Sequence, residues 1–164
     1  MKLPSFGRHD PAHDAMIEKA SREAESGRRL AMFDRQTGLY AYWYLVRRFE
    51  EEARRAERYA RPLTAMVIEV MGDESYKTLD ELTAWLDQEL RGTDLACHLG
   101  DGRFLIVLTE TSLADGAAIA ARMAERFPKA LAMGLGSFPE DGAQLDEVKR
   151  AAERRAHGNW ALAV

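Results

Sequence analysis

Cysteine is nearly absent from the sequence, since Cys97 is the only one among 164 residues. No disulfide can form within the chain, which excludes the small disulfide-stabilised scaffolds of secreted proteins. Aromatic residues make up only 9% of the chain, yet hydrophobic residues reach 46%, enough for one buried core. The composition favours a single globular domain of ordinary size over a disordered or fibrous chain.

Long apolar runs and an excess of positive charge are missing as well. No stretch approaches the roughly 20 apolar residues of a membrane-spanning helix, and residues 1–14 lack the apolar run of a signal peptide. We therefore expect a cytoplasmic protein with no membrane insertion. Lys and Arg number 23 against 27 Asp and Glu, a net charge of −4, which disfavours nucleic acid as a partner.

The N-terminal part of the chain differs from the rest. Residues 1–10 are polar, show no periodicity and are predicted to be a flexible tail. Residues 11–33 alternate small apolar residues with Glu and Arg, which predicts a helix. Its weak apolar stripe favours pairing with a second copy. We expect a homodimer through residues 11–33, followed by one domain over 34–164.

Hydrophobic periodicity divides residues 34–164 into helices and strands. Thr78 and Glu81 predict a capping box at the start of one helix, 78–90, and Thr111 or Ser112 is expected to cap the next helix, 113–127. Strands with local hairpin pairing and interspersed helices indicate an α+β fold. The expected helices are 40–60, 78–90, 113–127 and 144–156, and the expected strands are 63–70, 94–110 (a hairpin), 130–138 and 159–164.

Short patterns recur in a fixed order along this domain. They are DRQTGL (34–39), LTAMVIEV (63–70), RGTDLACHLGDGRF (91–104), GLGSFPEDG (134–142) and RRAHGNWALAV (154–164). Together they resemble the GGDEF domain of bacterial diguanylate cyclases, over roughly residues 30–164. The resemblance implies a central, mainly antiparallel sheet flanked by helices. It also implies that the N-terminal helix, 11–33, is of the signalling type that precedes the domain in members of the family.

The signature of the family is altered here. Aligned on the final aromatic residue, it reads Gly100, Asp101, Gly102, Arg103 and Phe104. The family places a metal-binding carboxylate and a second acidic group where Gly102 and Arg103 stand. Glu69 stands where the first strand of the family carries another metal ligand, and one carboxylate does not make a two-metal site. The resemblance therefore implies a degenerate domain that is not an enzyme and has no catalytic residue, no metal and no cofactor.

A second site of the family is retained in spacing. Its product site, where cyclic di-GMP binds and inhibits, is marked by R-x-x-D five residues before the signature, and Arg91 and Asp94 keep that spacing. An Arg fork can donate to the O6/N7 edge of guanine, and a carboxylate can accept from N1 and N2. Arg122 stands 18 residues beyond Phe104, where the family often has a further arginine. The resemblance implies a receptor for cyclic di-GMP that acts on an unknown downstream protein.

The same residues also allow a purely structural interpretation. Arg91 suits a helix C-terminus because of the helix dipole, and Asp94 is a common turn former. In that case the fold serves as a protein–protein interaction or dimerisation module that binds no nucleotide.

Other chemistry-bearing residues favour structural roles. The arginines between 47 and 61 alternate with Glu, which predicts a solvated helix face. Cys97 falls at an apolar strand position and is expected to be buried. Gly134 and Gly136 match no phosphate-binding loop, so we expect them to relieve crowding in a strand. The four histidines are scattered and do not have the spacing of a zinc site.

Overall fold

The structure of the chain is a computed structural model that describes residues 11–72 and 75–157. The chain divides into two compact units, Met1–Ala31 and Met32–Val164. Helix α1 (Pro11–Met32) supplies the described part of the first unit, so the helix predicted over 11–33 is present. The predicted tail, residues 1–10, and the predicted last strand, 159–164, lie outside the described residues.

Helix α1 is highly charged. Glu18 and Arg22 form an ion pair of 2.5 Å, and Lys19 and Glu23 lie 4.0 Å apart, one helical turn away in each case. Such exposed pairs stabilise a helix only slightly. The side chain of Met16 is 71% exposed, and α1 has no buried apolar face among its described side chains.

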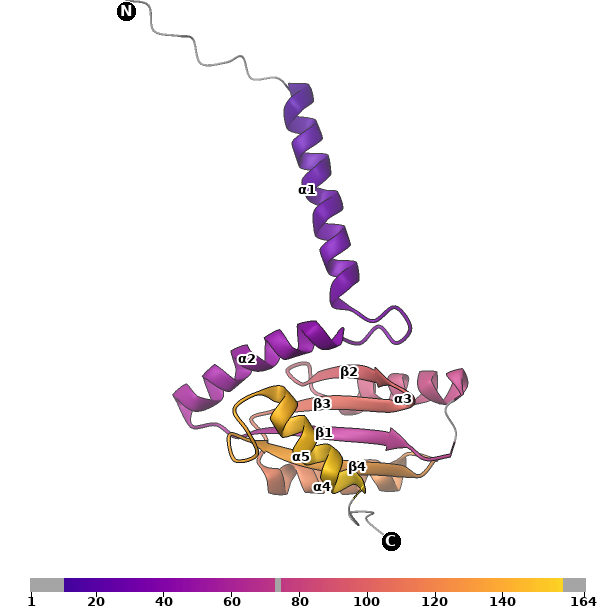
Figure 1. Cartoon of the computed structure of the whole chain (residues 1–164). Helices are drawn as coiled ribbons and strands as arrows, with labels where there is room; N and C mark the ends of the chain where they lie inside the picture. The colour runs from indigo at the N-terminus through magenta and orange to yellow at the C-terminus, as the bar shows by residue number, and fades with distance from the viewer. Residues whose placement is uncertain (1–10, 73–74, 158–164) are drawn as a thin grey trace, which may run out of the picture. The chain divides into compact units, whose positions relative to one another are not determined.

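The second unit contains the remaining elements in the predicted order. They are α2 (Tyr42–Tyr59), β1 (Leu63–Val70), α3 (Tyr76–Glu89), β2 (Leu95–Gly100), β3 (Arg103–Thr109), α4 (Leu113–Arg126), β4 (Leu131–Phe138) and α5 (Leu145–His157) (Figure 1). Within the described ranges, no helix is both long and apolar enough to cross a membrane.

The described strands form one sheet in the order β2-β3-β1-β4, and every neighbouring pair is antiparallel. The central strand β1 pairs Ile68 with Phe104 and Glu69 with Arg103 of β3. Helices pack on both faces of the sheet (Figure 1). The α+β prediction, with its mainly antiparallel sheet, is confirmed.

Alternation along the strands builds a core on each face, since successive side chains point to opposite sides. One core joins α2 and α5 to the sheet through Leu45, Phe49, Val67, Leu105 and Val148. The other joins α3 and α4 to the opposite face through Leu82, Leu86, Ile106, Phe104 and Met123.

Two glycines let α5 approach β4 closely. A Cβ atom on Gly134 would lie 2.0 Å from the carbonyl oxygen of Ala152, and one on Gly136 would lie 2.3 Å from that of Val148. No other residue fits where backbone meets backbone so closely. The expectation that these glycines relieve crowding is confirmed, and the crowding comes from the backbone of α5.

The helix caps agree with the sequence prediction in one case out of two. Ser112 caps α4 by accepting a hydrogen bond of 3.1 Å from the amide of Asp115, as expected. The capping box at Thr78 and Glu81 is wrong, because α3 begins earlier. Ser75 is its N-cap and accepts from the amide of Thr78 at 3.3 Å.

Candidate functional site

The altered signature forms the tight turn between β2 and β3. Asp101 and Gly102 are its two central residues, with φ angles of 50° and 67°. A two-residue hairpin turn of the primed type needs positive φ at both positions, which Asp-Gly tolerates well. Gly102 therefore has a structural reason to be here, and it offers no side chain to a metal or a substrate.

Beside this turn, Glu69 has an arginine and a histidine as neighbours. It pairs directly with Arg103 across the β1–β3 ladder, and its Oε2 lies 3.7 Å from Nε2 of His157. An arginine on the neighbouring strand does not fit a magnesium site, which needs carboxylate oxygens and water. Among the described residues, no three His, Cys, Asp or Glu side chains gather closely enough to hold a metal ion.

A cavity of about 250 Å³ lies next to the turn. Its described lining residues include Gln36, Ser75, Thr78, His98 and Gly102, and none of those described is charged. Burial lowers the pKa of His98, although the Asp34 carboxylate opposes this effect, so the imidazole is neutral near pH 7. A triphosphate needs cations around it. None of the described lining residues is a cation, and Lys129 reaches the border of the cavity by donating to the hydroxyl of the lining residue Thr78.

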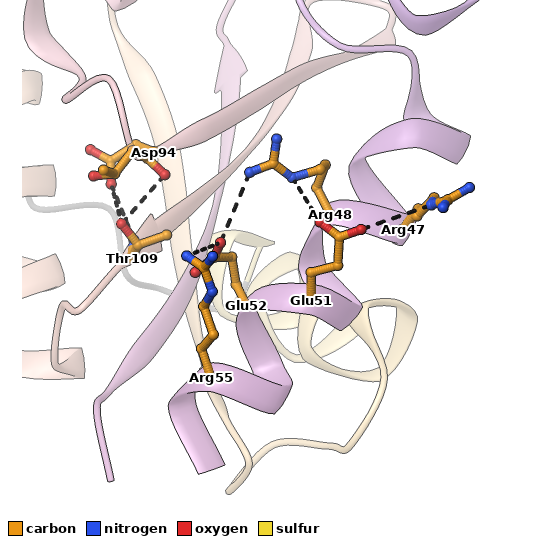
Figure 2. A network of polar contacts seen from close by, with 8 residues as sticks. Arg47, Arg48, Glu51, Glu52, Arg55, Asp94 and Thr109 are labelled. Carbon is orange, nitrogen blue, oxygen red and sulfur yellow. Dashed lines mark hydrogen bonds and ion pairs between the residues drawn. The ribbon is translucent and has the colours of Figure 1, made fainter. Parts of the chain in front are cut away.

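The R-x-x-D segment is held by its own aspartate. One carboxylate oxygen of Asp94 accepts from the amide of Arg91 at 3.0 Å, and the other accepts from the amide of Thr109 at 3.1 Å. Figure 2 shows Asp94 turned toward Thr109, at the end of β3. Asp94 therefore holds this turn in place. The Thr109 hydroxyl also donates to Oδ1 at 3.4 Å, so Oδ2 is the oxygen that keeps a further lone pair for a ligand.

Arg91 is exposed, and its guanidinium makes no hydrogen bond or ion pair within the described residues. It lies two residues beyond the end of α3, and Asp94 directly precedes β2. Both line a groove of about 300 Å³ together with Asp87, Phe33 and Tyr40. The structure thus brings the two predicted residues to one concave surface that also contains a second carboxylate and two aromatic rings.

Arg122 is not among the lining residues of this groove. Its Nε is 3.8 Å from a carboxylate oxygen of Glu89, and Arg126, one turn further along α4, binds the other oxygen at 2.6 Å. The side chain of Glu89 is only 9% exposed, while Arg122 is 52% exposed. Arg122 is therefore positioned by a buried acid near the end of α3, with its outer side open to solvent.

Sequence reasoning missed three residues of the groove: Phe33, Tyr40 and Asp87. The spacing of Asp87 and Arg91, four residues apart at the end of a helix, was a usable signal. Phe33 and Tyr40 flank the DRQTGL segment, but nothing in the sequence says that this segment folds against residues 87–96. That proximity depends on the tertiary fold.

The arginines of α2 are engaged within the helix itself. Arg48 lies 3.3 Å from Glu51 and 3.9 Å from Glu52, and Arg55 lies 3.4 Å from Glu52 (Figure 2). These are i,i+3 and i,i+4 pairs within one helix. Arg47, Arg54 and Arg55 are exposed, as the predicted solvated face requires, whereas the side chains of Arg48 and Glu52 are only 31% and 15% exposed.

Cys97 is fully buried, as expected. Burial raises the pKa of its thiol to about 12, which leaves the thiol protonated and unreactive.

Comparison with known proteins agrees with this geometry. The response regulator PleD of Caulobacter vibrioides is 29% identical over 107 residues, which is 57% of this chain but only 23% of PleD. The chain thus spans about a quarter of the length of this curated relative.

Two solved structures share the fold at low sequence identity. The first, the coiled coil and GGDEF domain of DgcB from Caulobacter crescentus in complex with c-di-GMP, has a TM-score of 0.73 and 14% identity, covering 89% of each chain. The second, the diguanylate cyclase SiaD in complex with its activator SiaC from Pseudomonas aeruginosa, has a TM-score of 0.68 and 19% identity, covering 89% of this chain and 64% of SiaD.

The family match covers more than half of the chain. The GGDEF-like domain family matches residues 58–154, a range that runs from the end of α2 into α5 and includes both the altered turn and the R-x-x-D segment. The chain belongs to the GGDEF-like domain family.

Proposed function

We propose that the domain is a catalytically inactive regulatory module that binds cyclic di-GMP through Arg91 and Asp94. The observation that carries the proposal is the contrast between two arginines, Arg103 on β3 and Arg91 in the segment that joins α3 to β2. Arg103 faces Glu69, where the family needs a metal ligand, whereas Arg91 projects into a groove without an internal partner among the described residues. The arginine beside Glu69 supports the proposed lack of catalysis, and the arginine in the groove, unpartnered within the described part of the chain, supports ligand binding.

Inactivity is supported by the residues at the turn. Gly102 contributes no carboxylate, Arg103 adds a positive charge beside Glu69, and the described lining of the neighbouring cavity is uncharged. We expect the purified protein to form no cyclic di-GMP from GTP with Mg²⁺ or Mn²⁺. A product assay by chromatography tests this, with an active cyclase as the positive control. Steady product formation that disappears in Glu69→Ala would overturn the proposed inactivity.

Ligand binding is supported by the pairing of a free guanidinium with a fixed carboxylate in one groove. Calorimetric titration with cyclic di-GMP measures it. A bidentate Arg–guanine contact contributes about 1–3 kcal/mol, so Arg91→Ala should weaken binding by about 5- to 150-fold. Arg150→Ala, an exposed arginine on α5, is the matched control and should bind like the wild type. Absence of heat at high micromolar ligand would refute the receptor function.

Arg122 is proposed to contribute to the same ligand through a phosphate. The outer side of Arg122 is exposed. Its position is fixed by Glu89, which stands two residues before Arg91 in the sequence. Because it does not line the groove, it would reach a ligand that extends out of the groove, on the same or a neighbouring subunit. Arg122→Ala should weaken binding less than Arg91→Ala, since an exposed phosphate contact is screened by salt.

Helix α1 is proposed to pair with a second copy of the chain. The charged and exposed character of its described side chains leaves its stability dependent on a partner. Light scattering should give the mass of a dimer for the full chain and of a monomer after deletion of residues 1–30. The same mass for both proteins would contradict this role.

The alternative function is a protein–protein interaction module that binds no nucleotide. A specific observation favours it: the structurally similar SiaD was solved in complex with a protein activator, SiaC. The titration described above discriminates between the two functions, because an interaction module would give no heat with cyclic di-GMP and would be indifferent to Arg91→Ala.

A further inference from the structure

One wall of the groove that holds Arg91 and Asp94 is aromatic. The rings of Phe33 and Tyr40 stack on each other, with centroids 5.3 Å apart and planes inclined by 24°. Both residues line the groove. Phe33 keeps 44% of its surface exposed although it is a large apolar side chain. An exposed ring at the edge of a concave, polar surface is a typical platform for a planar ligand.

This wall is fixed to the sheet. The amide of Tyr40 donates to the carbonyl oxygen of Ala96 at 3.0 Å, and Tyr40 forms an isolated parallel bridge with Cys97 of β2. Phe33 in turn forms an antiparallel bridge with Tyr40. The backbone that carries both rings is thus tied to the same strand that Asp94 precedes. A platform held in this way needs little reordering when a ligand binds.

The charges around the groove match a base better than a phosphate. Asp87, Asp94 and Arg91 supply two carboxylates and one guanidinium. A phosphate would meet a net negative lining, whereas guanine offers donors at N1 and N2 to a carboxylate and acceptors at O6 and N7 to an arginine. At about 300 Å³ the groove lies at the lower end of small-molecule sites, which suits a single base.

We propose that a guanine base of the ligand stacks on Phe33, with Tyr40 behind it, while Arg91 and the carboxylates of Asp87 and Asp94 bind its edges. This proposal rests on the proposed function and adds to it a stacking wall and a second acceptor. The phosphates then lie outside the groove. Adenine lacks the N1 and N2 donors that the carboxylates accept, so the groove selects guanine.

The test is a calorimetric titration of the full chain with cyclic di-GMP, comparing Phe33→Leu with Phe33→Tyr. Leucine keeps an apolar side chain but has no ring face, whereas tyrosine keeps the ring. Loss of a base–aromatic stack should weaken binding by about 5- to 150-fold in Phe33→Leu. Phe33→Tyr should bind within about twofold of the wild type. Tyr59→Leu, an exposed aromatic of α2 outside the groove, is the matched control.

Asp87 and base selectivity provide a second readout. Asp87→Ala should reduce the preference for cyclic di-GMP over cyclic di-AMP, and thermal unfolding should be unchanged because this side chain is exposed. If the wild type binds and Arg91→Ala does not, but Phe33→Leu binds normally, the stacking wall is refuted while the receptor function stands. If the wild type does not bind at all, both proposals fail together.

Discussion

The arginines at the two edges of the described sheet differ in whether the fold supplies their guanidinium groups with hydrogen-bond partners. At the β4 edge, Arg155 donates to the carbonyl oxygen of Leu135 at 2.7 Å and binds both carboxylate oxygens of Asp141 at 2.6 and 2.8 Å. At the β2 edge, Arg91 has no such partner within the described residues. A guanidinium satisfied inside the fold stabilises it, and one left open is available to a ligand. Stability and binding should therefore respond to different substitutions.

The largest effect is expected where α5 touches β4. Gly134→Ala would place a methyl group 2.0 Å from the carbonyl oxygen of Ala152, a backbone atom that cannot move without displacing the helix. We expect a loss of at least about 3 kcal/mol in the free energy of unfolding, measured by urea denaturation. Gly27→Ala, where a Cβ would meet nothing within 4 Å, is the control. Equal stability of the two variants would show that the contact is looser than the structure describes.

Asp94, at the β2 edge, is expected to contribute both to stability and to ligand binding. Asp94→Ala leaves the amides of Arg91 and Thr109 without their acceptor, which should cost about 1–3 kcal/mol. It should also weaken cyclic di-GMP binding and the preference for guanine. Asp80→Ala removes an exposed carboxylate from α3 and should change stability by less than about 0.5 kcal/mol. Calorimetry and thermal unfolding on the same samples separate the two losses.

A pH titration of stability isolates the β4 edge. The hydrogen bonds from Arg155 hold the pKa of Asp141 below its ordinary value of 3.8, although burial opposes this shift. Its contribution is therefore fully present above that value and is lost as the pH falls below 3.8 through the folded pKa. Asp141→Asn should cost about 1–3 kcal/mol near neutral pH. The gap to the wild type should narrow in acid, and a gap independent of pH would contradict the ion pair.

The smallest effect is expected at the altered turn. Arg103→Ala removes a half-buried cation from β3, away from the groove residues. Affinity for cyclic di-GMP should change by less than about twofold in calorimetry, in contrast to Arg91→Ala. A comparable loss in both variants would mean that the ligand occupies the turn rather than the R-x-x-D groove.

Local patterns in the sequence predicted most of the fold, because each depends on neighbouring residues. Alternation and helical spacing located every described strand and helix of the second unit, and the Asp-Gly turn located the hairpin. The capping prediction failed because Ser75 and Thr78 carry equally suitable hydroxyls and the sequence does not rank them. Both lie at the start of the same helix, and the choice between them depends on where the preceding loop delivers the chain.

Of the candidate site, the sequence predicted only the pair Arg91 and Asp94, from their spacing. The backbone hydrogen bond from Thr109 to Asp94 joins residues 15 positions apart. The pairing of Arg122 with Glu89 and the placement of Phe33 beside Arg91 join even more distant positions. Such contacts follow from how helices and strands pack, which periodicity along the chain does not encode.

The glycines of β4 also determine how a force or a tether would act on the domain. Because carbonyl groups of α5 sit directly above Gly134 and Gly136, a slide of the helix by one residue would bring different backbone atoms over each glycine and break the fit. A helix can slide along a sheet only where the two surfaces can pack in more than one register. A force along the axis of α5 would therefore have to displace the described helix from β4 as a whole, because a stepwise slide has no second register in which the backbones fit.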